Sequence, residues 1–345
     1  MVKIIALTDY KNRFGSKHFD HPYRSGMDKA LLTTLFLNSG FEIEFTQFTE
    51  LINRKDIPKN CYYLYTSSED IHYRYKNFIE DCILFLQQSG CKVIPGYDYM
   101  RANNNKVFME LLRKSTGNRE LQTIVSEVFG TYEEAMSVLL RLQFPVVIKT
   151  SEGATGRGVF KAENEREFKK KVKKVSNSFS LFYHFKEFIR VNIHKGYIRE
   201  SDYRNKFIVQ NMIKGLHNDW KVYFFGDKYY IFYRPVFKHR GFRASGGGYD
   251  NYFYGEEAKA EPGLLSFAED VVRCFKVPNA SIDIAWDGTR FHLIEIQFLY
   301  FGTAGIPYSG GYFTKDNSDW KFVENKLSIE EVYARSIELF INNNS

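Results

Sequence analysis

The first hundred residues alternate short apolar runs with segments of helical periodicity, and this rhythm constrains the fold more than any other feature. The helical patterns are Met27–Leu37 and Tyr73–Gln88. The apolar runs predict strands at Val2–Thr8, Phe41–Phe45, Cys61–Thr66 and Lys92–Pro95. Strands separated by helices favour a small parallel sheet covered by helices. The long polar loop after the first strand lacks GxGxxG, so a dinucleotide fingerprint is absent.

The composition predicts a soluble, cytoplasmic protein. With 345 residues, 44% of them hydrophobic, the chain can build two or three compact units. No run approaches the roughly 20 apolar residues of a membrane span. The four cysteines form no CxxC pair and are expected to be reduced core thiols.

The net charge of +7 is moderate, and many cations fall between Lys161 and Lys206. Such a run predicts a solvated helix face or an attraction for anionic ligands. Nucleic-acid motifs and membrane segments are not expected.

A glycine-rich segment, KTSEGATGRGV from Lys149 to Val159, lies between two predicted strands. Gly153, Gly156 and Gly158 allow the backbone to turn tightly, so that its N–H groups can converge on phosphate oxygens. Lys149 adds a positive charge beside them. The segment lacks the Gly-Lys-Ser/Thr end of a Walker A loop, and a purely structural turn is the alternative interpretation.

Two further features indicate a function only in combination with the glycine-rich segment. Lys106 falls on a predicted helix, Ala102–Lys114, where a lysine ordinarily faces solvent. The sequence FIVQNMI begins at Phe207 and predicts a strand that can offer backbone groups to an adenine edge, or else a plain central strand. With Trp220–Phe225 and Tyr229–Tyr233 it is expected to form three antiparallel strands.

A hairpin near the C-terminus carries acidic residues. Asp283 lies on its first strand, and Glu295 and Gln297 lie on the second, two positions apart and therefore on one face. The turn at Asp287-Gly288 brings the strands together. Two carboxylates and an amide oxygen suit Mg²⁺, although an ordinary polar hairpin face is the alternative.

Taken in order, these motifs resemble the ATP-grasp superfamily over roughly Tyr99 to Gly302. The matching pieces are Asn105-Lys106, Pro145–Lys149 with the glycine-rich segment, Val209–Ile213, Asp219–Val222, Phe242–Gly247, Ile282-Asp283 and Ile294–Gln297. The resemblance implies a fold of the α/β and α+β classes: an ATP-grasp fold preceded by an N-terminal βαβ (pre-ATP-grasp) domain. The expected domains are 1–98, a lid subdomain at 99–206 and a C-terminal subdomain with the metal site at 207–345.

The resemblance also assigns roles to the matching residues. Those expected to bind ATP are Lys106, Lys149, Gly153, Thr155, Gly156, Gly158, Gln210, Asn211, Met212 and Ile213. Those expected to hold Mg²⁺ are Asp283, Glu295 and Gln297. Those expected to act in catalysis, by stabilising negative charge at the reaction centre, are Arg243, Arg234 and Lys221.

The sequence departs from the family pattern at two places. The family usually has Glu-x-Asn where this chain has Glu295-x-Gln297, which leaves the geometry of a second metal ion undefined. The hinge usually carries a glutamate where Asn211 stands, followed by an acidic ribose contact. Leu216-His217-Asn218 occupy that stretch here, so ribose recognition is unassigned.

The expected function is that of an ATP- and Mg²⁺-dependent carboxylate–amine ligase that forms an acyl phosphate and releases ADP and phosphate. A kinase and a non-catalytic nucleotide-binding module are the alternatives. The carboxylate and amine are expected to be small molecules: an amino acid, a peptide or an acidic sugar. The segments 9–26, 179–202 and 300–313 are expected to shape the substrate pocket. Dimers are frequent in this superfamily, so a homodimer is an open alternative for the assembly of this chain.

Overall fold

The computed structural model describes residues 1–15, 25–68, 70–153, 156, 158–236 and 251–344. They form two compact units. Unit 1 comprises Met1–Asn103 with Leu216–Ser345, and unit 2 comprises Asn104–Gly215. Parts of the expected first and third domains therefore fall in one unit, and the three-domain division stays a prediction.

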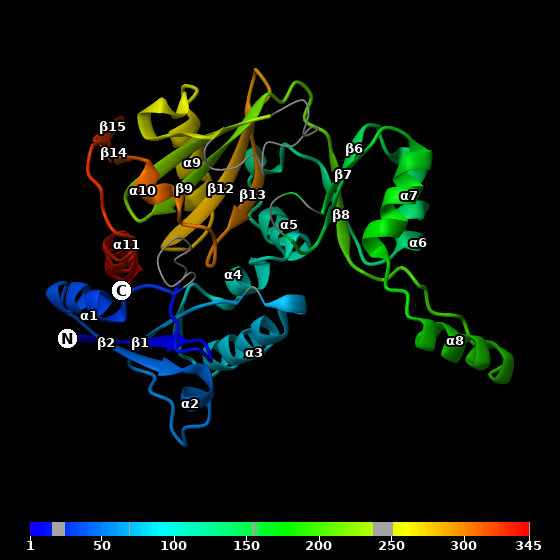
Figure 1. Cartoon of the computed structure of the whole chain (residues 1–345), viewed down its shortest axis with the longest axis horizontal. Coiled ribbons are helices and arrows are strands. Elements are labelled where there is room, and N and C mark those ends of the chain that lie inside the picture. The colour runs from blue at the N-terminus through cyan, green and yellow to red at the C-terminus, as the bar shows by residue number, and fades with distance from the viewer. Residues whose placement is uncertain (16–24, 69, 154–155, 157, 237–250, 345) are drawn as a thin grey trace. The chain divides into compact units, whose positions relative to one another are not determined.

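Unit 1 contains a parallel sheet of strand order β2-β1-β3-β4 (Figure 1). Its strands are β1 (Val2–Thr8), β2 (Phe41–Gln47), β3 (Tyr62–Tyr65) and β4 (Lys92–Ile94). The helices of this region are α1 (Lys29–Asn38), α2 (Phe48–Ile52), α3 (Arg74–Gln88) and α4 (Tyr97–Ala102). The apolar, largely β-branched run of β1 is buried from Ile4 to Leu7, as a central parallel strand requires. The βαβ prediction is confirmed.

The second sheet of unit 1 is antiparallel, of order β13-β12-β9-β10-β14-β15, with β11 beside β10. Its strands are β9 (Asn218–Phe225), β10 (Lys228–Pro235), β11 (Phe253–Tyr254), β12 (Asn279–Trp286), β13 (Phe291–Gln297), β14 (Tyr312–Asp316) and β15 (Asp319–Val323). Its helices are α9 (Leu264–Arg273), α10 (Gly305–Tyr308) and α11 (Ile329–Asn344). One apolar core joins α1 and β1 to β9, β10 and α11. This core fixes the antiparallel sheet against the parallel one.

Unit 2 is built on a four-stranded antiparallel sheet of order β5-β8-β6-β7. Its strands are β5 (Ser126–Phe129), β6 (Val146–Thr150), β7 (Val159–Ala162) and β8 (Phe207–Asn211). Its helices are α5 (Lys106–Ser115), α6 (Tyr132–Ser137), α7 (Glu165–Ser176) and α8 (Leu181–Ile193). The core of this unit lies between the sheet and helices α6 and α7.

The position of β8 corrects one expectation. The sequence predicts that Phe207–Met212 pairs in one antiparallel set with the two following strands. Instead, β8 pairs with β5 and β6 in unit 2, whereas β9 and β10 pair in unit 1. Antiparallel pairing between sequence neighbours is the usual default, but β8 is buried between two strands of its own unit.

Candidate functional site

The glycine-rich segment of unit 2 connects β6 to β7 and is closed at its base by the backbone. The Thr150 N–H donates to the Gly158 carbonyl at 2.9 Å. Gly153 and Gly156 have positive φ angles of 112° and 72°, which glycine adopts without strain. A Cβ on Gly158 would lie 1.9 Å from Thr150 Oγ1, so only glycine fits there. Thr155, one of the predicted ATP-binding residues, lies outside the described residues.

Lys106 opens α5 and is buried, not solvent-facing as an isolated helical lysine would be. Its Nζ donates to the Gly153 carbonyl at 2.7 Å, and its backbone N–H donates to the Ser151 carbonyl at 2.8 Å. Asn105 caps the helix and accepts from the Ser151 hydroxyl at 3.0 Å. The predicted pair Asn105-Lys106 is therefore attached directly to the glycine-rich segment. Lys149, also buried, lies on β6 at the start of that segment.

The predicted adenine hinge begins at the end of β8. Gln210 is buried and donates from Nε2 to Glu110 Oε1 at 3.0 Å. Glu110 in turn pairs with Arg113, which also donates to the Ile124 carbonyl at 3.2 Å. This buried chain fixes the Gln210 side chain, so that its backbone is held in a defined orientation. Asn211 is exposed, and Met212 and Ile213 follow β8 without regular structure.

Those predicted metal and catalytic residues of unit 1 that the structure describes lie on one face of its antiparallel sheet. Asp283 on β12 is paired directly with Glu295 on β13 and with Lys221 on β9. Gln297 pairs with Ser281 two positions away, on the same face. Residues directly opposite on neighbouring strands point to the same side. The structure therefore brings these five side chains together, as the sequence predicts for the hairpin.

Arg234 on β10 lies beside these side chains and completes a row of charged groups. It donates from Nε to Asp219 at 2.5 Å, and its Nη2 forms an ion pair with Asp283 at 2.9 Å. Lys221 Nζ lies 2.7 Å from the other oxygen of Asp283 and 2.9 Å from the Ser281 hydroxyl. Two cations and two carboxylates thus alternate across β10, β9 and β12. Arg234 is more deeply buried than Lys221 and Asp283.

The charges of this row are set by burial and by one another. Burial alone would raise the pKa of Asp283, but the charges of Arg234 and Lys221 outweigh it and hold that pKa well below its usual value. Burial raises the pKa of Asp219 against the opposing charge of Arg234. The pKa of Arg234 is raised by the two carboxylates, against the effect of its own burial. Asp283 is consequently an anion at any physiological pH.

The donor set on this face fits a magnesium ion that also binds a ligand. Asp283, Glu295 and Gln297 offer hard oxygen atoms, which Mg²⁺ prefers. In the described part of the chain, no group of three or more His, Cys, Asp and Glu side chains gathers as a metal site. Two carboxylates and one amide leave coordination positions for water and phosphate oxygens, as in nucleotide-bound Mg²⁺ sites. The residues therefore fit a metal that arrives with a nucleotide.

The chain is similar to known proteins in one domain and in its fold. A family model of the RimK-like ATP-grasp domain matches residues 102–209. A RimK-domain ATP-grasp protein from Sphaerobacter thermophilus superposes with a TM-score of 0.52 at 11% identity, covering 98% of this chain and 99% of that one. The chain has an ATP-grasp fold. The expected fold class and the resemblance to the ATP-grasp superfamily are confirmed.

Two ATP-grasp neighbours have named activities. D-cycloserine synthetase aligns with a TM-score of 0.53 at 10% identity over 97% of this chain and 98% of that one. N5-carboxyaminoimidazole synthetase from Staphylococcus aureus, crystallised with ADP, aligns with a TM-score of 0.51 at 10% identity over 93% and 80%. No curated protein sequence matches the chain. At these identities the neighbours establish the ATP-grasp fold alone.

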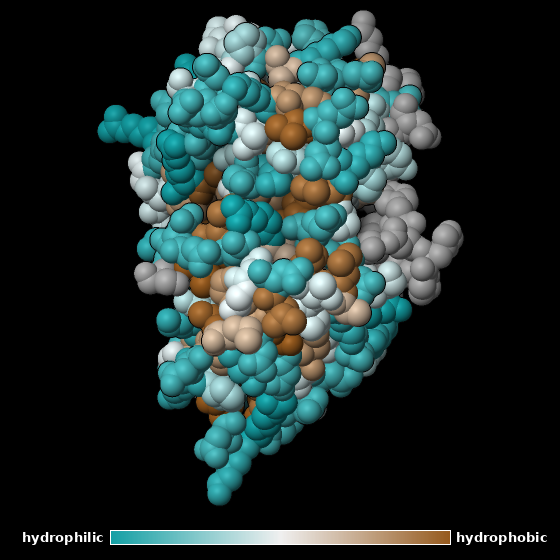
Figure 2. Space-filling model, turned by 90° about the vertical axis from the view of Figure 1, so that its left-hand side faces the viewer, coloured by the Kyte–Doolittle hydropathy of each residue, from teal (hydrophilic) through white to brown (hydrophobic). Residues whose placement is uncertain are grey.

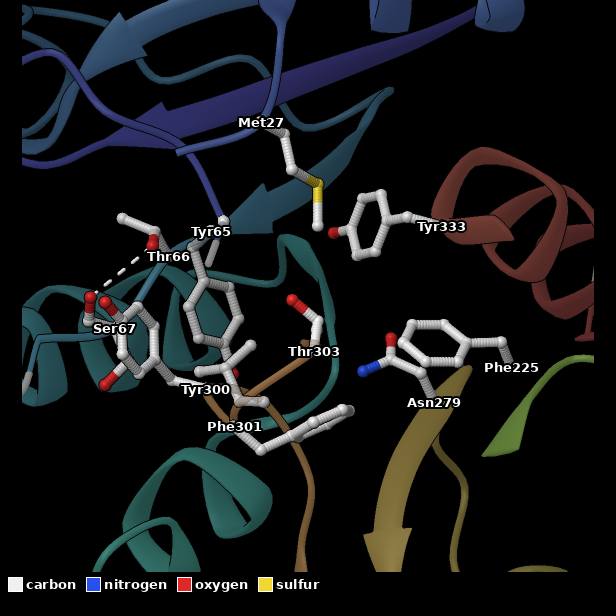
Figure 3. Close-up of a pocket in the computed structure, with 12 residues that line it drawn as sticks. Met27, Tyr65, Thr66, Ser67, Phe225, Asn279, Tyr300, Phe301, Thr303 and Tyr333 are labelled. Atoms are coloured by element: carbon white, nitrogen blue, oxygen red, sulfur yellow. Dashed lines mark hydrogen bonds between the residues drawn. The ribbon is translucent and has the colours of Figure 1, made fainter. Parts of the chain in front are cut away.

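Unit 1 also contains a small pocket, drawn in Figure 3. Gly15 from the loop after β1 and Tyr300, Phe301 and Thr303 after β13 line it, so two of the three segments expected to shape a substrate pocket meet here. The other lining residues are Met27, Tyr65, Thr66, Ser67, Phe225, Asn279, Leu299 and Tyr333. None of the lining side chains is charged at neutral pH. The pocket is therefore suited to an uncharged group.

Two polar residues of the site, Ser281 and Glu110, were not singled out from the sequence, because each contributes only by contacting a residue distant in sequence. Asp219 belongs to a motif that matches the superfamily, but the sequence analysis assigned it no role. It stands two positions before Lys221 on one strand and so shares its face. Arg243, one of the residues expected to act in catalysis, lies outside the described residues together with the rest of Phe242–Gly247. No helix in the described part of the chain has the length and hydropathy needed to cross a bilayer.

Proposed function

We propose that this chain is an ATP- and Mg²⁺-dependent carboxylate–amine ligase that works through an acyl phosphate. The observation that carries the proposal is the row of Lys221, Arg234, Asp283 and Glu295 on one sheet face. Cations held beside carboxylates can stabilise the negative charge that phosphoryl transfer develops, and such a transfer requires no protein nucleophile.

The nucleotide is assigned to residues of the glycine-rich segment and the hinge. Backbone N–H groups at Gly153, Gly156 and Gly158, with Thr155, would contact phosphate oxygens. The ammonium groups of Lys106 and Lys149 would add charge beside them. The burial of both lysines and the bond from Lys106 to Gly153 support this assignment. The backbone from Gln210 to Ile213 would receive the adenine edge.

Magnesium is assigned to Asp283, Glu295 and Gln297. When bound, the ion neutralises charge on the phosphoryl group that is transferred. The low pKa of Asp283 supports this role, because a metal ligand must be deprotonated. The charge of Lys221, whose Nζ also donates to the Ser281 hydroxyl, keeps the carboxylate in place while a ligand binds.

The proposed chemistry has two steps. A substrate carboxylate oxygen attacks the γ-phosphorus of ATP, the bond to the bridging oxygen breaks, and ADP leaves. An amine nitrogen then attacks the acyl carbon and loses a proton, and phosphate leaves with the bonding electrons. Lys221 is more accessible than Arg234 and is assigned to contact the reacting oxygens. Arg243 is assigned the same role. Arg234 is assigned mainly to orient Asp283.

An uncharged part of the carboxylate or amine substrate is assigned to the pocket of unit 1. The buried Ser67 hydroxyl, which has no hydrogen-bond partner among the described residues, lines this pocket and supports the assignment. A hydroxyl or amide group on the substrate would satisfy it. This part of the proposal favours a hydroxylated or amide-bearing substrate over one with a second charged group at that position.

The test is ATP turnover by the purified chain with Mg²⁺, scored for ADP, AMP and phosphate against pools of carboxylates and amines. ADP and phosphate released only with both substrates present would establish the ligase. ADP with a stable phosphorylated acceptor and no need for an amine would replace it by a kinase. AMP as the nucleotide product would overturn the acyl-phosphate mechanism.

A further inference from the structure

Unit 2 carries a projecting segment that the proposed function does not use. We call residues 177–205 the arm; it contains α8 and lies beyond α6 and α7 (Figure 1). Its two ends are joined by backbone bonds, from Ser178 N–H to the Asp202 carbonyl at 2.9 Å and from Asn205 N–H to the Ser176 carbonyl at 3.0 Å. The arm therefore leaves unit 2 and returns to it at the same place, where these backbone hydrogen bonds join its two ends.

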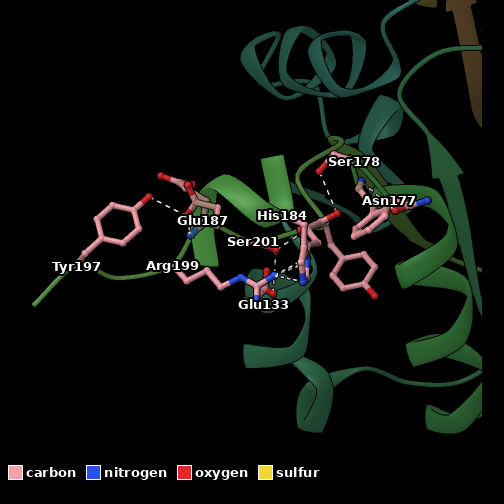
Figure 4. Close-up of polar contacts among 12 residues, drawn as sticks. Glu133, Asn177, Ser178, His184, Glu187, Tyr197, Arg199 and Ser201 are labelled. Carbon is pink, nitrogen blue, oxygen red and sulfur yellow. Dashed lines mark hydrogen bonds and ion pairs between the residues drawn. The ribbon is translucent and has the colours of Figure 1, made fainter. Parts of the chain in front are cut away.

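The polar side chains of α8 form their hydrogen bonds and ion pairs within the arm itself. Glu187 is buried and accepts from the Tyr197 hydroxyl at 2.8 Å, from Arg190 at 2.6 Å and from the Glu200 N–H at 3.0 Å. His184 lies 3.2 Å from Asp202, which also pairs with Arg199 at 3.0 Å. Figure 4 shows these contacts between the helix and the returning chain. The returning chain thus covers the polar face of α8.

The apolar face of α8 is left in solvent. Helical spacing at 100° per residue gathers six large apolar side chains on one side of the helix. We call this set the apolar stripe; its members are Leu181, Phe182, Phe185, Phe188, Ile189 and Ile193, each between 39% and 77% exposed. In the face of the molecule seen in Figure 2, apolar residues emerge only in separate groups among polar ones. An exposed stripe of this kind marks a binding surface.

Charge indicates what this surface binds. The arm holds five Lys and Arg against three Asp and Glu, so it contributes +2 to the net charge of the chain. Within the arm, the acidic side chains are each paired with an arginine: Glu187 with Arg190, Asp202 with Arg199, and Glu200 with Arg204. Lys186 on α8 is exposed beside the apolar stripe, and Lys195 is exposed just after the end of α8. The arm therefore presents apolar surface bordered by positive charge.

We propose that α8 lies on an anionic membrane surface, with the apolar stripe in the boundary between headgroups and acyl chains. A helix with phenylalanines on one face and cations at its border has the composition of interfacial helices. Lys186 stands over the Phe182 ring at 5.7 Å, so its ammonium lies close to the stripe and can reach lipid phosphates. A helix of 13 residues is too short to span a bilayer, which agrees with a position on its surface.

A second copy of the chain fits this surface less well. In a two-fold interface a patch meets itself, so the border cations of one arm would face those of the other. Like charges at such a contact oppose association. An anionic lipid surface instead attracts each basic side chain near it by about 1 kcal/mol.

The test is flotation of the full chain with phosphatidylcholine vesicles that either contain or lack phosphatidylglycerol. We expect binding only to the anionic vesicles, weakening as salt is raised. The double variant Phe185→Ser/Phe188→Ser should lose binding at least about tenfold, because each buried CH₂ contributes about 0.8 kcal/mol. Phe85→Ser on α3, also an exposed phenylalanine, is the matched control and should bind as the parent does. Circular dichroism checks that each variant is folded.

Three results would overturn the proposal. Equal binding to neutral and anionic vesicles would remove the role of charge. Unchanged binding of the double variant would place the contact elsewhere. Absence of vesicle binding, combined with a dimer in light scattering that the double variant dissociates, would make the apolar stripe an interface between copies. Vesicle binding is measured without ATP or substrates, so its outcome is independent of the ligase assignment.

Discussion

Arg234 and Asp283 pair at 2.9 Å although their strands, β10 and β12, are not neighbours. Strand β9 lies between them, and the arginine reaches across it while also pairing with Asp219 on that strand. The guanidinium therefore holds two carboxylates that would otherwise repel each other. Removing it would leave both carboxylates without their shared cation in a poorly hydrated place.

Arg234→Met is expected to destabilise the chain by about 3–5 kcal/mol, since removing one member of a buried ion network leaves uncompensated charge. Urea unfolding followed by tryptophan fluorescence measures this, because Trp220, Trp286 and Trp320 all lie in unit 1. Arg273→Met is the control. Its exposed pair with Glu269 should contribute only about 0–1 kcal/mol. Equal losses in the two variants would contradict the role given to the row.

Glu295→Gln should lower kcat/KM on the order of 100-fold and raise the Mg²⁺ concentration that half-saturates the rate, since the metal contributes several kcal/mol to charge stabilisation. The measurement is a magnesium titration of ATP turnover. Gln297→Asn, which restores the amide usual in this superfamily, should keep activity within about tenfold of the parent. Normal Mg²⁺ dependence in Glu295→Gln would remove this residue from the metal site.

Gly158→Ala should weaken ATP binding by about 10- to 100-fold, because the new methyl group would displace the glycine-rich segment from Thr150. Titration calorimetry with ATP measures the change. The double variant Thr150→Ala/Gly158→Ala removes the clashing Oγ1 and should recover part of the affinity. Failure of the second substitution to help would mean that the close approach to Thr150 is not the cause.

The arm should open in acid. Hydrogen bonds from the Glu200 N–H, and next from Tyr197 and Arg190, lower the pKa of Glu187 from 4.5 to about 2. A lowered pKa stabilises the fold fully above 4.5, and this contribution is lost as the pH falls from there toward 2. Amide exchange at Glu200, corrected for the intrinsic rate, should therefore accelerate in that window.

Glu187→Gln should show fast exchange at Glu200 already at neutral pH and little further change in acid. Glu200→Gln is the matched control, because its carboxylate makes only an exposed pair with Arg204. If the parent's exchange at Glu200 stayed constant from about pH 5 to about 2, the hydrogen bonds to Glu187 would not hold the arm.

Much of the fold could be predicted from local patterns. The strand Val2–Thr8 matches its predicted bounds, and the hairpin around Asp287-Gly288 forms where the turn residues indicated. Such elements depend on periodicity and turn chemistry within about 20 residues, which a sequence displays directly. The helix predicted over Ala102–Lys114 corresponds to α5, which begins four residues later, at Lys106. Asn105 caps α5, and this later start could have been anticipated from the asparagines at 103–105.

The sequence by itself determined the order and spacing of the motifs, and with them the parallel sheet, the glycine-rich segment and the shared face of Glu295 and Gln297. Only the tertiary structure decided that β8 pairs in unit 2, that Lys106 is buried against Gly153, and that Arg234 meets Asp283 across β9. The physical reason is that periodicity fixes which way a side chain points relative to its own element, whereas strand partners and buried charge pairs depend on packing between segments far apart in the chain.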